Sequence, residues 1–354
     1  MIRTRICNLL NIKYPIIQAS MAWATNAEMV AAISEAGGMG TLGPNAGQKT
    51  VTRDPYETGE RLRDQIRKVK NYTNKPFAVN IIVPSNEIEK KFSDYCLKVT
   101  IDENVPVAVV SQGSPNVYTK TLKEVGIKVL HVISNKRHAI KCEQADVDAV
   151  ITSGTEGGGH SGFGRLTTFT LVPWVADSIR IPIIAGGGIA DGRGLVAALA
   201  LGADGVYMGT RFLATQECPI HPNVKELLLK TDGTNTVSII HGGYPFEEST
   251  DLISEVRRGS LRLIINDYVR ELLKLQAEGK QKEFENLLNS PPPYRDDISR
   301  TMASAVYGDL THGWLGAGQE VGLINDIPTC KELIERIAKE AEEILKKLQN
   351  LKIS

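Results

Sequence analysis

The sequence predicts an α/β protein built as a (β/α)8 TIM barrel with a smaller, mainly helical second domain. Eight short apolar runs rich in β-branched residues recur within about 210 residues and alternate with helical segments. Their apolarity is continuous rather than alternating, which is typical of parallel strands buried on both faces. An open, doubly wound sheet is the alternative, because eight strands do not by themselves prove closure. The predicted strands cover residues 14–20, 38–43, 76–83, 105–112, 128–134, 147–154, 181–188 and 205–210.

Capping residues support helices between these strands. Asn26 is a good N-cap for one helix, and Gly37 follows as its stop signal. Asp191 and Gly202 bracket a second helix in the same way. The capping residues and the apolar runs therefore both predict that strands and helices alternate along the chain.

The pattern changes after Phe212, and three segments result. Residues 1–214 are predicted to form the barrel, and residues 215–325 a mainly helical lid over the substrate. Helical periodicity covers residues 254–288 before the proline-rich stretch NSPPPYRD, and no further buried strands are expected. Residues 326–354 are predicted to form an amphipathic helix that packs back on the barrel.

Composition excludes several classes of function. The 41 basic and 41 acidic side chains cancel, so no broad nucleic-acid or acidic-membrane surface is expected. Five dispersed cysteines without a CxxC pair predict reduced thiols and a cytoplasmic protein, and neither a signal peptide nor a membrane span is evident. A small molecule is the expected partner, and a homodimer would be an ordinary assembly for such a barrel.

Glycine-rich loops follow three neighbouring strands, where a barrel places its chemistry. The stretch GTEGGGHSGFG, residues 154–164, holds His160 among six glycines. Gly187 and Gly188 precede the helix at Asp191, and Gly209 and Thr210 end the next strand, which predicts a phosphate site. From the residues alone, the ligand could be a sugar phosphate, a nucleotide or a flavin phosphate.

Other sequence features limit the reactions and ligands that the predicted site could have. No lysine ends a predicted strand, which argues against a Schiff-base aldolase. The chain lacks HExxH, and its six histidines do not cluster along the sequence, so no metal site is expected. The stretch QASMAW at 18–23 and Asn80 would suit a flat heteroaromatic ring that needs stacking and hydrogen bonds at its edge.

Several of these stretches resemble the nitronate monooxygenase family, formerly called 2-nitropropane dioxygenases. They are PIIQASMAW, EGGGHSG, GAGQEVGLI and IPIIAGGGIADGRGLVAALALGADGVYMGTRFLATQECPIH, and the resemblance extends from about residue 3 to 345. NAD(P)H:quinone reductases and flavin-dependent enoyl-ACP reductases are close relatives of that family. The resemblance implies a TIM barrel that binds FMN noncovalently, with a smaller helical domain over the flavin.

The resemblance also implies roles for individual residues. His160 would lie beside the isoalloxazine as the catalytic residue, and Gln319 would close the substrate side. The sequence differs from the family pattern at Ser20, where glycine or alanine is common, and in EGGGHSG, where nitronate oxidisers often have EAGGHRG. Contacts to FMN are implied for Ala19, Ser20, Met21, Asn80, Gly158, Gly159, Gly187, Gly188, Gly209 and Thr210.

Three functions are compatible with these residues, and the family resemblance favours the first as the expected function. The first is an FMN-dependent monooxygenase that oxidises alkyl nitronates with O2. The second is an FMN reductase that takes electrons from transiently bound NADH or NADPH and acts on quinones or enoyl-ACP or enoyl-CoA thioesters. The third is a non-redox barrel with a phosphate ligand. His160 could exchange a proton in either flavin reaction, so it does not choose between them.

The remaining conspicuous residues are assigned structural roles. His131 lies within a predicted strand, and His138 is expected to be exposed on the following helix. His221 is expected to shape a loop between prolines, and Cys218 has no base next to it in sequence. Tyr207 is assigned to the core, while Trp23 could stack near the flavin or fill the core.

Overall fold

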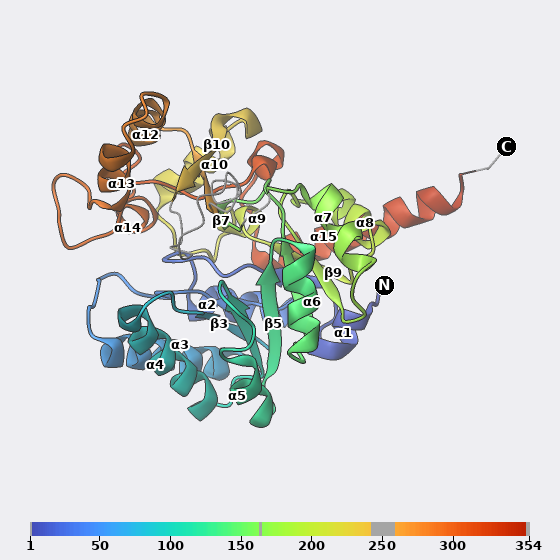
Figure 1. The fold of residues 1–354 in the computed structure, drawn as a ribbon. Helices are drawn as coiled ribbons and strands as arrows, with labels where there is room; N and C mark the ends of the chain where they lie inside the picture. Colours follow the sequence, from blue (N-terminus) through green and yellow to red (C-terminus); the bar gives the residue numbers. More distant parts are fainter. Residues whose placement is uncertain (1, 163–164, 242–258, 352–354) are drawn as a thin grey trace.

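Eight parallel strands form the centre of the molecule, as the sequence predicts (Figure 1). The computed structural model describes residues 2–162, 165–241 and 259–351. Continuous burial along most strands reflects the apolar runs that predict them. The barrel strands are Ile16–Gln18 (β1), Thr41–Leu42 (β2), Ala78–Ile82 (β3), Val107–Ser111 (β4), Lys128–Ile133 (β5), Ala149–Ser153 (β6), Ile183–Gly186 (β8) and Gly205–Met208 (β9).

Contacts between the first two strands bring the ends of the sheet together. β1 pairs with β9 on one side, and Ile17 forms a parallel bridge with Met39 just before β2 on the other. The Gln18 amide donates to the Met39 carbonyl at 2.9 Å, and the Gln18 side-chain oxygen accepts from the Thr41 amide at 2.8 Å. The sheet therefore curls into a barrel, and the open, doubly wound alternative is wrong.

Helices cover the outside of the barrel. The predicted caps are present: the Asn26 side chain accepts from the Met29 amide at 2.9 Å, and Asp191 accepts from the Arg193 amide at 2.9 Å. The barrel helices are Arg5–Leu10 (α1), Ala27–Glu35 (α2), Pro55–Tyr72 (α3), Glu87–Asp102 (α4), Thr119–Glu124 (α5), Lys136–Gln144 (α6), Thr168–Ala176 (α7), Gly192–Ala200 (α8) and Thr210–Leu213 (α9).

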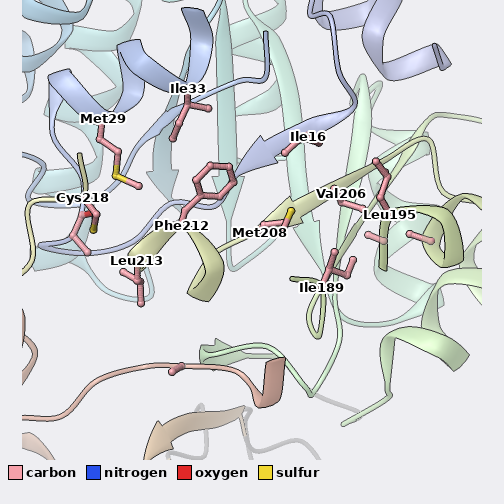
Figure 2. Close-up of a cluster of buried hydrophobic side chains, with 14 of the residues drawn as sticks. Ile16, Met29, Ile33, Ile189, Leu195, Val206, Met208, Phe212, Leu213 and Cys218 are labelled. Carbon is pink, nitrogen blue, oxygen red and sulfur yellow. The ribbon is translucent and has the colours of Figure 1, made fainter. Parts of the chain in front are cut away.

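The alternation of side chains along each strand separates two apolar layers. One layer fills the barrel and includes Ile17, Val109 and Leu130. The other lies between strands and helices, where Phe212 is fully buried. Figure 2 shows Phe212 close to Ile33 of α2 and Met208 of β9, so the segment after β9 is anchored to the wall of the barrel.

A second unit lies over one end of the barrel, shown in yellow and brown in Figure 1. Its helices are Pro222–Lys230 (α10), Asp267–Ala277 (α12), Gln281–Asn289 (α13) and Arg300–Ala305 (α14), with 3-10 turns at Gly233–Asn235 (η1) and Gln319–Leu323 (η2). It also contains Thr236–His241 (β10) antiparallel to Gly259–Ile264 (β11). The expectation of no further strands is therefore wrong. Part of the predicted helical stretch, residues 254–258, lies outside the described residues.

The last helix, Cys330–Gln349 (α15), packs against α8 and α2. Thr329 and Glu332 form a capping box at its start. Glu340 accepts from the Gly192 amide at 3.0 Å, which fixes α15 to the first turn of α8. Its apolar side buries Leu333, Ile334 and Ile337. None of the helices in the described ranges is both long and apolar enough to cross a membrane.

Candidate active site

Two chain segments meet over the carboxyl ends of the barrel strands. One is the glycine-rich stretch after β6, and the other is the GAGQE segment, residues 316–320. The Gln319 amide donates to the Glu156 carbonyl at 2.9 Å, and the Gly318 amide donates to Thr210 Oγ1 at 2.9 Å. The predicted lid residue Gln319 is thus held against the loop that carries His160.

Glycine permits this close approach. A Cβ added at Gly158 would lie 2.5 Å from two backbone carbons of Ala317, and one at Gly316 would lie 2.9 Å from the Gly159 nitrogen. Any side chain at these positions would push the two segments apart. These glycines therefore serve packing between the two segments.

His160 itself lies on a short strand, Gly159–Ser161 (β7), rather than in a free loop. β7 pairs antiparallel with β11, with His160 opposite Leu261, and completes a three-stranded sheet with β10. The His160 side chain is exposed at this end of the barrel. The second unit therefore sets the backbone position of the predicted catalytic residue.

The predicted phosphate loop has the backbone shape that an anion site needs. Gly187 and Gly188 have φ angles of +104° and +74°, which favour glycine. Thr168 Oγ1 donates to the Gly187 carbonyl at 2.8 Å and fixes the loop from the side of α7. A Cβ at Gly157 would come within 3.3 Å of the Gly187 Cα, so the His160 segment touches this loop directly.

Carboxylates already occupy the amides at the start of α8. Asp191 accepts from the amides of Arg193 and Gly194, and Glu340 accepts from Gly192. These amides are not available to a phosphate. The backbone of Gly187 and Gly188 and the hydroxyl of Thr210, the first residue of α9, lie together near this point, and Gly188 and Thr210 hydrogen-bond to the carboxyl group of Glu320. Together these three residues are called the anion cradle below.

A buried carboxyl group at the anion cradle was missed by sequence reasoning. Glu320 is only 6% exposed, and its Oε2 has no hydrogen-bond partner among the described residues. Burial raises the pKa of Glu320 to about 7, and the nearby charge of Glu156 raises it further, against hydrogen bonding from Thr210 and the Gly188 backbone. The cradle therefore already faces an acidic oxygen that is easily protonated.

Arg262 on β11 was also missed. This buried guanidinium donates to the Thr155 carbonyl at 2.9 Å and to Thr236 Oγ1 at 3.2 Å. Burial lowers its pKa, while the charges of Glu320 and Glu156 oppose that shift. Its positive charge thus lies beside two carboxylates and ties β11 to the loop after β6.

On the opposite side of the cradle, the end of β1 is held against β9. The Ala19 amide donates to the Met208 carbonyl at 2.9 Å, and the Ser20 amide donates to the Tyr207 hydroxyl at 2.8 Å. Tyr207 therefore does more than fill the core, because its hydroxyl fixes a predicted cofactor residue. A Cβ at Gly209 would lie 3.8 Å from the Met21 sulfur, so Met21 adjoins the Gly209–Thr210 corner.

Asn80 on β3 is buried near the same end of the barrel. Its side-chain nitrogen donates to the Val109 carbonyl at 2.9 Å and to Ser111 Oγ at 3.1 Å. The amide nitrogen is therefore engaged with β4. Any contact of Asn80 with a ligand would fall to its side-chain oxygen.

The other residues singled out in the sequence lie elsewhere. His221 Nδ1 accepts from the Asn223 amide at 3.2 Å and caps α10, in keeping with a loop-shaping role. Cys218 is buried, and burial raises the pKa of its thiol to about 12, which makes it a poor nucleophile. Trp23 is buried in the layer between strands and helices. His138 is half-buried against His131, so the expectation of an exposed side chain is wrong.

Comparison with known proteins decides the family. The profile described as nitronate monooxygenase matches residues 3–340. The chain belongs to the nitronate monooxygenase family. It is 31% identical to a probable nitronate monooxygenase of Staphylococcus saprophyticus, with 97% of this chain and 98% of that protein covered. Membership in this family makes the chain an enzyme of the flavin-dependent oxidoreductase type.

Two further relatives carry other names. A (3aS,4S,5R,7aS)-5-hydroxy-7a-methyl-1-oxo-octahydro-1H-indene-4-carboxyl-CoA dehydrogenase of Rhodococcus jostii is 34% identical, with 96% of each chain covered. The solved structure of FabK from Thermotoga maritima is 38% identical, covers 99% of each chain and superposes with a TM-score of 0.82. The chain is thus similar, over almost its whole length, to proteins that carry different names.

Proposed function

We propose that this chain is an FMN-dependent oxidoreductase that reduces enoyl thioesters with NADH or NADPH. One observation carries the proposal: the segment that touches the anion cradle through Gly157 presents His160, three residues later, as an exposed acid or base. A cofactor phosphate bound at the cradle would place the rest of the cofactor next to this histidine. The proposed cofactor anchor would thus lie beside the proposed proton donor.

The residues present fit FMN. Gly187 and Gly188 lie in the left-handed region and present backbone to an anion, and Thr210 adds a hydroxyl. An ionised Glu320 would repel a phosphate, but a carboxyl group with a pKa of about 7 can stay protonated and donate a hydrogen bond to it. Ala19, Ser20 and Met21 would line the ring. When bound, the flavin passes a hydride between nicotinamide and substrate.

The reaction balances with one nicotinamide and one proton. The β-carbon of the enoyl thioester receives a hydride that originates on NAD(P)H, and its α-carbon receives a proton. The products are the saturated thioester and NAD(P)⁺. His160 is the proposed proton donor, because imidazole has an ordinary pKa near 6.5 and can give up a proton near neutral pH.

The relatives support this substrate class. The dehydrogenase of Rhodococcus jostii is named for a CoA thioester, and the FabK structure is 38% identical across nearly the whole chain. Oxidation of alkyl nitronates is the second candidate, which the family description and the 31% identical relative favour. In that reaction the electrons would come from the nitronate rather than from a nicotinamide.

Anaerobic mixing experiments test the proposal. The flavin-loaded enzyme is mixed separately with NADH, NADPH and propyl nitronate, and flavin absorbance is followed by stopped flow. We expect rapid bleaching by a nicotinamide and recovery of the absorbance when crotonyl-CoA is added. Bleaching by propyl nitronate alone would overturn the proposal in favour of the monooxygenase. Recovery with a quinone but not with crotonyl-CoA would reject the thioester as substrate.

A further inference from the structure

A cluster of metal-ligand side chains lies apart from the candidate active site, between β5 and α6. His131 comes from β5, and His138 and Cys142 come from α6. Their ligand atoms all lie within 4.8 Å of one another. The expectation from the sequence that the histidines would not cluster is therefore wrong. The spacing along the chain hides the cluster because the strand and the helix contribute separately.

All three side chains point into the layer between the barrel strands and the surrounding helices. Leu130 and its alternate neighbours face the barrel interior, so His131 faces the helices together with Val129 and Ile133. His138 and Cys142 are four residues apart and share one face of α6. His131 and Cys142 are both 0% exposed.

Both histidines lack the hydrogen bonds that buried polar groups normally make. Neither ring nitrogen of His131 has a partner among the described residues, and the same holds for Nε2 of His138. The two rings meet edge to face with centroids 4.9 Å apart. An unsatisfied buried polar group costs about 1–3 kcal/mol. Three such nitrogens in one cluster need an explanation.

We propose that His131, His138 and Cys142 bind one divalent transition-metal ion of the Zn²⁺ class. Two imidazole nitrogens and one thiolate are the donors that such a borderline ion prefers. Tetrahedral coordination needs ligand atoms about 3.3–3.8 Å apart. The three side chains would therefore move together by about 1 Å, and a solvent oxygen or a backbone carbonyl would complete the site.

The proposed ion has a structural role. It would join α6 to β5 on the outer side of the barrel wall and satisfy two of the three buried nitrogens, one on each imidazole ring. Cys142 would bind the ion as a thiolate, so its thiol proton would pass to solvent as the metal–sulfur bond forms.

Cobalt and zinc titrations test the site without any assay of activity. Protein stripped with a chelator is titrated with Co²⁺, and the thiolate-to-cobalt charge-transfer band and the d–d bands of tetrahedral Co²⁺ are recorded. We expect about one Co²⁺ per chain, displacement by Zn²⁺, and a higher melting temperature with Zn²⁺. Cys142→Ala should abolish the charge-transfer band. Cys96→Ala, which removes a cysteine outside the cluster, should retain it.

His138→Ala provides a second variant, because His138 is only half-buried and its loss should be tolerated. We expect its affinity for Co²⁺ to fall by about 100-fold or more. Absence of a charge-transfer band in the parent protein would overturn the proposal. Persistence of the band and affinity in either Cys142→Ala or His138→Ala would overturn it equally, because the metal would then bind elsewhere.

Discussion

Replacing His160 with alanine is expected to lower kcat for enoyl thioester reduction by about 10²–10⁴-fold, the usual contribution of a positioned general acid. The side chain is exposed on β7, and its backbone is held by pairing with β11. Removing the imidazole should leave this strand in place. The loss should therefore appear in the step that consumes the thioester. Reduction of the bound flavin by NADH or NADPH should remain within a few-fold of the parent rate.

Ser161→Ala is the matched control for this variant. Ser161 is the next residue of β7, and its hydroxyl contacts Ser260 at 2.6 Å, away from the proposed proton transfer. Both variants are compared with the parent in separate measurements of flavin reduction and reoxidation. Equal reoxidation rates for His160→Ala and the parent protein would show that His160 is not the proton donor.

Replacing Glu320 with glutamine is expected to have the second large effect. It should change how the free energy of unfolding depends on pH. Glu320 keeps its proton in the folded state up to about pH 7, whereas an ordinary glutamate loses it near 4.5. The folded state therefore binds more protons, and stability falls as the pH rises from about 4.5 through about 7. The cost levels off at about 3 kcal/mol above that range. A glutamine side chain is neutral over this whole pH range, so the Glu320→Gln variant does not lose this stability.

Thermal unfolding of the flavin-free protein between pH 5 and pH 8.5 measures this effect. The melting temperature of Glu320→Gln should rise relative to the parent protein as the pH increases. Glu343→Gln, which removes an exposed carboxylate paired with Lys339 at 3.9 Å, controls for the loss of one negative charge. A difference between Glu320→Gln and the parent that does not change with pH would mean that the Glu320 carboxyl group is not held protonated.

The barrel could be predicted from the sequence because each parallel strand is buried on both faces and is therefore a continuous apolar run. Each of the eight apolar runs contains one barrel strand, and the predicted caps at Asn26 and Asp191 are present. Closure was predicted from the number and spacing of the strands alone, because the pairing that closes the barrel joins strands at opposite ends of the sheet. Nothing in the apolar runs 14–20 and 38–43 indicates that Ile17 and Met39 form a bridge.

The strands of the second unit were harder to predict. β11 is a short stretch, GSLRLI, directly before the strongly helical pattern of α12, and the helical periodicity was extended across it. Its partner β7 is only three residues long and lies among glycines about 100 residues earlier in the chain. Tertiary pairing, rather than local propensity, makes both segments strands.

The candidate site shows the same division between local and tertiary information. The conformation of the glycine loops is local, so Gly187 and Gly188 could be singled out. Glu320 and Arg262 could not, since the burial of a charged side chain is set by segments that meet only in the fold. The clustering of His131 with His138 and Cys142 depends likewise on which face of β5 meets α6.

Binding of FMN and of riboflavin by the flavin-free chain tests the central claim most directly. The two molecules share the isoalloxazine ring, and only FMN carries the phosphate that the anion cradle would hold. Charge-assisted hydrogen bonds from the cradle predict that FMN binds about 100-fold or more tightly than riboflavin, measured by quenching of flavin fluorescence. Gly188→Val, at a residue with a φ of +74°, should remove most of that preference. Equal affinity for the two flavins, or no binding of FMN, would contradict the account.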